Sequence, residues 1–264
     1  MSAPHLLVER EDHVAIVTFN RPEARNAFSL EMLARMADAW AMIDADPEIR
    51  AVILTGAGGI FSAGADLKMM HSNQAGDPWH ARFQEDPDLH WRALLRHHRL
   101  TKPVVAAVEG VAFGGGTEIL QATDIRVAAE TARFGVTEAR WGLFPLGGST
   151  VRLRRQMPYT KAMEILLMAQ PLTAAEALDA GLIGRVVPEG QALAEARRIA
   201  QIIASNGPLA VQSILRSVRE TEGMTEADAL ARELEIGWPV IQSQDAREGA
   251  RAFSEKRSPE WKGR

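Results

Sequence analysis

The chain has 264 residues, of which 46% are hydrophobic and 24% charged, a composition that predicts a globular protein with a substantial buried core. Its 30 basic and 34 acidic residues leave a net charge of −4, which argues against a nucleic-acid-binding protein, and the absence of cysteine excludes disulfides, thiolate catalysis and cysteine-bound zinc. Because the sequence shows no secretory signal and no apolar run long enough to span a membrane, we expect a cytoplasmic protein with no membrane partner.

Short apolar segments alternate with helical patterns in the first half of the chain. These strand-like segments lie at residues 14–19, 51–55, 104–108 and 125–128. Between the first two, Ser29 is suited to cap the start of a helix that Pro47 closes. Strands interleaved with helices predict an α/β fold with a largely parallel sheet that helices cover.

From about residue 158 the pattern becomes almost entirely helical. Helices are predicted at residues 161–169, 173–180, 191–205, 208–220 and 226–241, with a short strand at residues 185–187. We therefore expect two parts, a core of residues 1–200 and a C-terminal helical region of residues 201–264. A polar insert at about residues 71–102 carries five histidines and two tryptophans, with only a weak helix near residues 89–98.

Several familiar catalytic motifs do not match the sequence. The glycines at residues 56–59 follow a predicted strand, but Phe61 occupies the third glycine position of a dinucleotide-binding fingerprint, and no phosphate-binding lysine follows. Neither Ser62 nor Ser149 has both flanking glycines of a nucleophile elbow. The histidines of the insert lack the spacing of a zinc-binding helix, so we expect no metal site.

Two glycine-rich turns, at residues 62–67 and 113–120, each follow a predicted strand and precede a helix-like segment. Glycine allows a ligand to approach the main chain closely, and the N–H groups at a helix start point outward. Two such N–H groups that converge on one oxygen would form an oxyanion hole. Two ordinary strand–helix turns are the alternative interpretation, which these residues alone leave open.

Four sequence segments occur in order at compatible spacing, together with a typical C-terminal ending. They span residues 20–27, 58–67, 111–118, 132–138 and 252–257. Over nearly the whole chain they closely resemble the enoyl-CoA hydratase/isomerase (crotonase) family. The resemblance implies a crotonase-like core built as a spiral of ββα units, with a C-terminal helical trimerisation region. It further implies a homotrimer or a dimer of trimers.

The resemblance also assigns the catalytic groups. It places the oxyanion-hole N–H groups on Ala65 and Gly115, in agreement with the two glycine turns, and the two catalytic carboxylates on Glu118 and Glu138. Outside these motifs, Glu118 would be an ordinary acidic residue of a first helical turn and Glu138 a surface glutamate. The family pattern assigns Glu118 mainly to water activation and Glu138 to protonation at C2 of the substrate.

Contacts to coenzyme A carry over from the same family pattern. They fall on Ala24, Arg25, Ala63, Asp66, Leu67, Lys68, Gly114 and Lys256. Lys68 is placed to pair with a phosphate of coenzyme A, and Lys256 to do so from a neighbouring subunit, although a solvated surface lysine is the alternative at each position. No cofactor is expected, because coenzyme A enters as part of the substrate.

The two glutamates favour a 2-enoyl-CoA hydratase in the degradation of fatty or related acyl groups. An enoyl-CoA isomerase or another enolate reaction, including retro-Claisen cleavage, and a non-catalytic acyl-CoA-binding protein are the alternatives. Thr137, Arg140, Trp141 and Leu146 depart from the common hydratase pattern beside the expected acyl pocket, which the insert also borders. The acyl group that the protein accepts is therefore left open.

Overall fold

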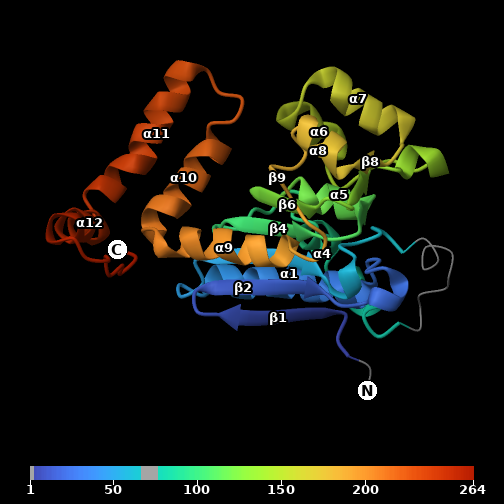
Figure 1. Cartoon of the computed structure of the whole chain (residues 1–264), viewed down its shortest axis with the longest axis horizontal. Helices are drawn as coiled ribbons and strands as arrows, with labels where there is room; N and C mark the ends of the chain where they lie inside the picture. The colour runs from blue at the N-terminus through green and yellow to red at the C-terminus, as the bar shows by residue number, and fades with distance from the viewer. Residues whose placement is uncertain (1–2, 67–76) are drawn as a thin grey trace.

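The computed structural model describes residues 3–66 and 77–264, and its centre is a six-stranded sheet with the strand order β1-β2-β3-β4-β6-β9. The strands are β1 (Leu6–Glu11), β2 (Val14–Phe19), β3 (Ala51–Gly56), β4 (Val104–Val108), β6 (Ile125–Ala129) and β9 (Arg185–Val187). β1 pairs antiparallel with β2, and all the other neighbours in this sheet are parallel. The predicted parallel sheet is therefore confirmed (Figure 1).

A second, smaller sheet has the strand order β5-β7-β8. Its strands are β5 (Val111–Phe113), β7 (Arg133–Gly135) and β8 (Leu172–Thr173). The sequence does not predict them, because segments of two or three residues are too short to show the alternation of a strand. It does not predict β1 either, since half of the residues of this edge strand are charged.

Helices cover both faces of the large sheet. Successive residues of a strand point to opposite faces, and the apolar side chains on each face are buried under helices. Ile16 belongs to the apolar cluster under α9 (Ala192–Ser205), whereas Val17 belongs to the larger cluster that includes α1 (Leu30–Ala45). The Ser29 hydroxyl accepts a hydrogen bond from the Met32 N–H at 3.1 Å, which confirms the predicted helix cap.

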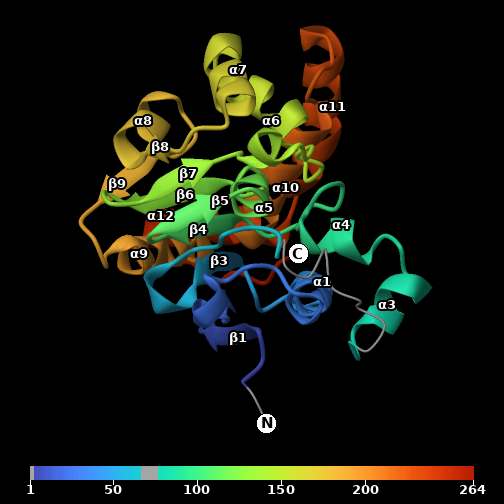
Figure 2. The same ribbon diagram turned by 90° about the vertical axis from the view of Figure 1, so that its right-hand side faces the viewer.

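The described chain also contains shorter helices. They are α3 (His80–Glu85), α4 (Leu89–Ala93), α5 (Gly115–Leu120), α6 (Ser149–Gln156), α7 (Tyr159–Met168) and α8 (Ala174–Asp179), with the 3-10 turns η1 (Pro22–Ala24), η2 (Ala57–Gly59) and η4 (Glu138–Trp141). Figure 2 shows α5 between α4 and α6. The weak helix expected near residues 89–98 ends at Ala93, because Leu95 adopts a left-handed conformation with a φ of 50°.

Three helices at the C-terminus extend away from the sheets (Figure 1). They are α10 (Pro208–Glu220), α11 (Glu226–Ile241) and α12 (Gln244–Glu255), and the first two match the predicted helices residue for residue. The expected boundary after residue 200 falls inside α9, which packs on the sheet. In the part of the chain that the structure describes, no helix is both long and apolar enough to cross a membrane.

Candidate active site

The two glycine turns predicted from the sequence lie against each other. The Phe113 N–H donates a hydrogen bond to the Ser62 carbonyl oxygen at 2.9 Å, which joins β5 to the first turn. Gly64 has a φ of 85°, and a Cβ at this position would lie 2.4 Å from the Phe113 oxygen and 2.8 Å from the Gly115 nitrogen. Because only glycine combines this conformation with so close an approach, Gly64 is required where the turns meet.

The backbone N–H groups of Ala65 and Gly115 lie close together at this junction. A Cβ built on Gly115 would be 3.7 Å from the Ala65 nitrogen. Within the described ranges 3–66 and 77–264, neither N–H donates a hydrogen bond to another protein group. Gly115 begins α5, and the first N–H groups of a helix have no acceptor within the helix. Both donors are therefore available to a ligand oxygen.

Glu118 lies one turn further along α5 and is only 4% exposed. The Ser149 N–H donates to its Oε1 at 3.2 Å, and the Gly147 N–H also donates to the carboxylate. A Cβ on Gly147 would lie 2.6 Å from Glu118 Oε2, so a side chain there would displace the carboxylate. Burial raises the pKa of Glu118, while these hydrogen bonds and the charge of Arg152 act in the opposite direction.

Glu138 begins η4 and is half-buried beside Gly114. A Cβ on Gly114 would lie 3.2 Å from Glu138 Oε1, whereas the buried Oε2 has no hydrogen-bond partner in the part of the chain that the structure describes. Burial and, second, the negative charge of Glu118 raise the pKa of Glu138 to about 7.

The two predicted glutamates therefore form one electrostatically coupled pair in unlike surroundings. Donated hydrogen bonds and a nearby guanidinium favour the ionised form of Glu118. For Glu138, burial and the charge of its neighbour outweigh the hydrogen bonds of the Glu138 and Thr137 backbone and favour the protonated form, and its Oε2 has no partner in the described residues. Such unlike carboxyl groups suit general base and general acid chemistry at neutral pH.

A family model described as enoyl-CoA hydratase/isomerase matches residues 9–264 of the chain. The chain belongs to the enoyl-CoA hydratase/isomerase family. It is 56% identical to the enoyl-CoA hydratase EchA19 of Mycobacterium tuberculosis, with 100% of this chain and 98% of that protein covered. It is 37% identical to the (E)-benzylidenesuccinyl-CoA hydratase of Thauera aromatica, with 97% of this chain and 98% of that protein covered.

Solved structures of this family share the fold. The crystal structure of an enoyl-CoA hydratase from Mycobacterium tuberculosis H37Rv matches with a TM-score of 0.89 and 38% identity, over 99% of this chain and 100% of that one. A structure of an enoyl-CoA hydratase from Bacillus anthracis matches with a TM-score of 0.90 and 34% identity, over 98% and 100%. The family and the crotonase-like α/β fold predicted from the sequence are both confirmed.

Only some of the residues that the family pattern assigns to coenzyme A binding lie close together in this structure. The Ala63 N–H donates to the Arg25 oxygen at 2.9 Å, so the loop that carries Ala24 and Arg25 lies against the first glycine turn. In the same turn, Asp66 Oδ2 is 2.7 Å from Nη1 of Arg21.

The other predicted coenzyme A positions are spread over the chain. Gly114 lies in the second turn, and Leu67 and Lys68 lie outside the described residues. Lys256 ends α12, which is distant from α5 (Figure 1). Within one subunit, therefore, Lys256 is not close to the two turns.

Arg152 of α6 is a residue of the site that the sequence analysis missed. Its Nη2 donates to the carbonyl oxygens of Leu95 and Arg96 at 2.5 and 2.7 Å, and its Nη1 donates to that of Gly147 at 3.3 Å. Burial lowers the pKa of Arg152 to about 10. Arg152 thus holds the loop that donates to Glu118, a role that depends on contacts distant in sequence and has no local sequence signal.

Large apolar side chains are exposed beside Glu138. They are Trp141, Leu143, Phe144 and Leu146, on η4 and the loop that follows it. Two of these positions, Trp141 and Leu146, are among the departures from the family pattern noted in the sequence. The apolar character of this loop makes it a surface on which an acyl group or another chain could bury area.

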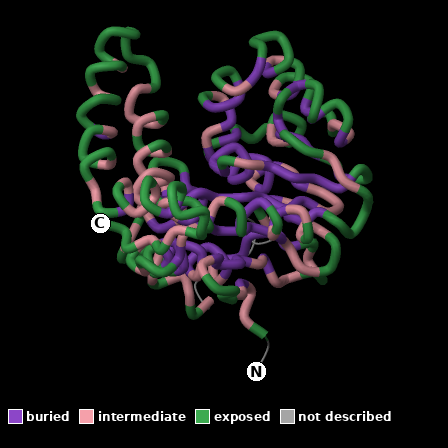
Figure 3. Tube along the Cα trace, turned by 60° about the vertical axis from the view of Figure 1, so that its left-hand side comes forward, coloured by how far each residue is buried: buried purple, intermediate pink, exposed green. Residues whose placement is uncertain are grey.

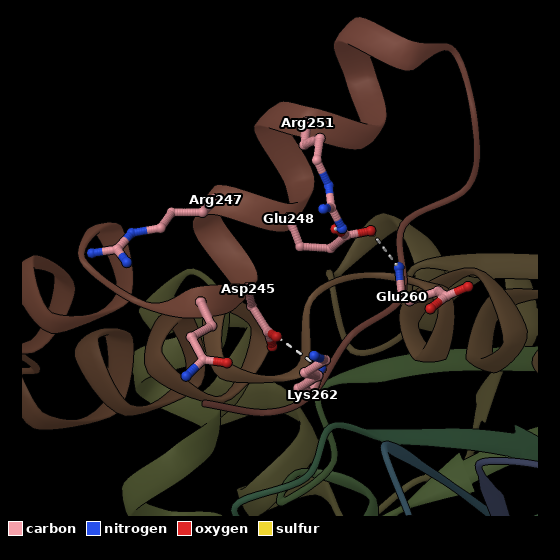
Figure 4. Close-up of a pocket in the computed structure, with 7 residues that line it drawn as sticks. Asp245, Arg247, Glu248, Arg251, Glu260 and Lys262 are labelled. Atoms are coloured by element: carbon pink, nitrogen blue, oxygen red, sulfur yellow. Dashed lines mark hydrogen bonds and ion pairs between the residues drawn. The ribbon is translucent and has the colours of Figure 1, made fainter.

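A separate pocket of about 270 Å³ lies near the C-terminus, at the start of α12 (Figure 4). Two of its carboxylates are already bonded: Glu248 accepts from Arg251 and from the Glu260 N–H, and Asp245 accepts from the Lys262 N–H. These contacts fasten the end of the chain to α12. In the described residues, no group of three or more His, Asp and Glu side chains could hold a metal ion.

Proposed function

We propose that this protein is an enoyl-CoA hydratase that adds water across the 2,3-double bond of a 2-enoyl-CoA thioester during the degradation of fatty or related acyl groups. One observation carries the proposal: a buried and a half-buried glutamate, electrostatically coupled, lie beside two backbone N–H groups that have no partner in the described protein. The hydratase names of full-length relatives support it. No cofactor is required, because the thioester itself activates the double bond.

The N–H groups of Ala65 and Gly115 are proposed to bind the thioester oxygen. Attack of water at C3 moves electrons through the conjugated system onto this oxygen and forms an enolate. Two donors directed at the developing negative charge stabilise it, and loss of one such donor costs roughly 100- to 1000-fold in rate. Proton addition at C2 then completes the 3-hydroxyacyl-CoA product.

Glu118 is proposed as the base and Glu138 as the acid. As the oxygen of the water molecule bonds to C3, Glu118 accepts one of the water's two protons. Glu138 gives a proton to C2. The second proton stays on the new hydroxyl group, and transfer from Glu118 to Glu138 restores the pair. The hydrogen bonds that Ser149 and Gly147 donate to Glu118 favour this direction, as does the pKa of about 7 for Glu138.

Binding of coenzyme A is proposed at the positions that the family pattern indicates. Ala24, Arg25, Ala63 and Asp66 would contact it from the first turn and its neighbouring loop, and Gly114 would contact the substrate from the second turn. Leu67, Lys68 and Lys256 remain proposals from the sequence, the last from a neighbouring subunit. The cytoplasmic location also stays a prediction.

A homotrimer, or a dimer of two trimers, is proposed to form through residues 201–264, with residues 1–200 as the catalytic core. Apolar side chains of α10 and α11 line a groove of about 420 Å³, among them Ile214, Val218, Leu234 and Ile241. Each of these four side chains is more than half exposed in the isolated chain. Burial of such a surface in an assembly would be favourable.

The decisive experiment follows the loss of enoyl-thioester absorbance with crotonyl-CoA and with longer and bulkier 2-enoyl-CoA esters. We expect wild-type turnover on at least one ester and losses of several orders of magnitude in both Glu118→Gln and Glu138→Gln. If wild type hydrates none of them but shifts the double bond of 3-enoyl-CoA, the protein is an isomerase instead. Binding of acyl-CoA without turnover of any ester would indicate a non-catalytic protein.

A further inference from the structure

Behind Glu118 lies a buried pair of polar side chains, Gln121 and Ser149. The Gln121 Nε2 donates to the Ser149 Oγ at 2.8 Å, and both residues are fully buried. Ser149 also contacts Glu118 directly, because its N–H donates to Oε1 at 3.2 Å, and its hydroxyl acts to lower the pKa of the carboxyl group. Ser149 is thus the connection between Gln121 and Glu118.

The positions of these residues in the helices fix the direction of the contacts. Gln121 directly follows α5 as its C-cap with a helical backbone, three residues after Glu118, so the two side chains lie on neighbouring positions of one helix face. Ser149 is the first residue of α6, where a backbone N–H has no acceptor within its own helix. Since the Gln121 amide donates to Ser149 Oγ, the Ser149 hydroxyl does not need to donate to Gln121, and its proton is available to the Glu118 carboxylate.

Gln121 is itself held in place from the opposite side. Its backbone carbonyl oxygen accepts from Gln156 Nε2 at 2.9 Å and from Arg126 Nη2 at 3.2 Å. Apart from the bond that Nε2 donates to Ser149, its side-chain amide has no hydrogen-bond partner in the described ranges, and its buried Oε1 is unpaired. A buried amide that leaves one atom unpaired costs free energy, and the contact with Ser149 is the one hydrogen bond that the Gln121 side chain makes in the described ranges.

We propose that Gln121 and Ser149 are positioning residues that orient the carboxylate of Glu118 and keep it ionised as the base of the hydration reaction. This inference rests on the proposed function. It explains how two neighbouring glutamates take different roles: Glu118 receives a chain of donors that ends in a hydroxyl and an N–H, whereas Glu138 Oε2 has none.

Two charged side chains also act on Glu118. Arg152, from α6, favours its ionised form, and Glu138, from η4, faces it across the site with the opposite effect. Neither is changed by substitutions at Gln121 or Ser149. A hydrogen bond to a carboxylate lowers its pKa, so removal of the Ser149 hydroxyl is expected to raise the pKa of Glu118.

The test compares Ser149→Ala, Gln121→Met and the double variant with wild type in steady-state hydration assays between pH 5 and 9. We expect kcat to fall roughly 10-fold or more in each single variant with little change in KM, since these residues do not touch the substrate. The apparent pKa on the acid side of the kcat–pH profile should rise by about 0.5 to 1 pH unit. Because both residues act through one chain, the double variant should lose no more than Ser149→Ala alone.

Gln156→Met is the matched control, because Gln156 contacts the backbone of Gln121 but not Ser149. It should leave the acid limb unchanged, and Ser149→Thr, which retains a hydroxyl, should keep the wild-type profile. Thermal unfolding monitors folding, and if Ser149→Ala does not fold, the profile of Gln121→Met decides alone.

An unshifted acid limb with additive losses in the two variants would overturn the inference and leave the hydratase proposal intact. Full activity of Glu118→Gln would instead overturn the proposed function itself.

Discussion

Two regions of the molecule differ in the kind of side chain that they bury. Around α5, charged and polar groups such as Glu118 and Gln121 are buried, whereas α10 and α11 hold apolar side chains in the solvent: Val218 and Ile241 are each 68% exposed. Figure 3 shows the same contrast as a largely buried core beside mostly exposed C-terminal helices. Buried charge is typical of catalytic sites and exposed apolar surface of association, so we expect these two tasks in different regions of the chain.

The largest expected effect tests the junction of the two turns. Gly64→Ala introduces a Cβ that meets the Phe113 oxygen at 2.4 Å, so the turns must separate and the two N–H groups can no longer share one oxygen. We expect kcat/KM for hydration to fall at least about 100-fold.

Gly223→Ala provides the control from the C-terminal region. Gly223 has a similar φ of 82°, but a Cβ there meets no atom within 4 Å. Only the cost of the left-handed conformation, about 1 kcal/mol, should appear in thermal unfolding. Equal losses of activity in the two variants would show that backbone strain, and not the junction, controls catalysis.

A second substitution tests the apolar surface. Val218→Asp combined with Ile241→Asp places two charges in the groove between α10 and α11, where burial against a neighbouring subunit would be strongly unfavourable. Light scattering should show dissociation into smaller species. The matched control is Ile202→Asp, on the exposed side of α9 and outside that groove, which should leave the assembly unchanged.

If Lys256 contacts the coenzyme A bound to a neighbouring subunit, dissociation of the subunits should also raise KM for the acyl-CoA substrate. A wild-type chain that is monomeric at all concentrations would contradict the assignment of this region to association.

The smallest effect concerns stability and pH. Because the pKa of Glu138 is raised to about 7 in the folded protein from 4.5, ionisation of this group opposes folding. Its unfavourable contribution is absent below pH 4.5 and grows as the pH rises to about 7. We expect Glu138→Gln to gain on the order of 1 to 3 kcal/mol in unfolding free energy relative to wild type between pH 5 and 8. A difference independent of pH would contradict the raised pKa.

The sequence predicts long elements better than short ones. Helices α10 and α11 are long enough for the sequence to show their helical hydrophobic period and their ends. The capping hydroxyl of Ser29 indicates the start of α1. Strands β5 and β7 escape prediction, although they carry the chain into the two catalytic segments, because three residues show no period. The helix α6 escapes as well, since its sequence contains only two large apolar residues.

The same limit applies to the site. Ala65, Gly115, Glu118 and Glu138 are predicted from local motifs, because each lies within a contiguous segment that resembles the family pattern. Arg152 and Gln121 are not, because each acts through contacts with residues 28 to 57 positions away. Three-dimensional contacts alone distinguish them from other polar residues of a helix.

The most direct test of the central claim is a crystal structure with a bound substrate analogue such as acetoacetyl-CoA. We predict that the thioester oxygen lies about 3 Å from the N–H groups of both Ala65 and Gly115. The carboxylates of Glu118 and Glu138 should lie on the side of C2 and C3 from which water and proton are added. A thioester oxygen bound away from these two N–H groups, or an acyl chain that does not pass between the glutamates, would contradict the account.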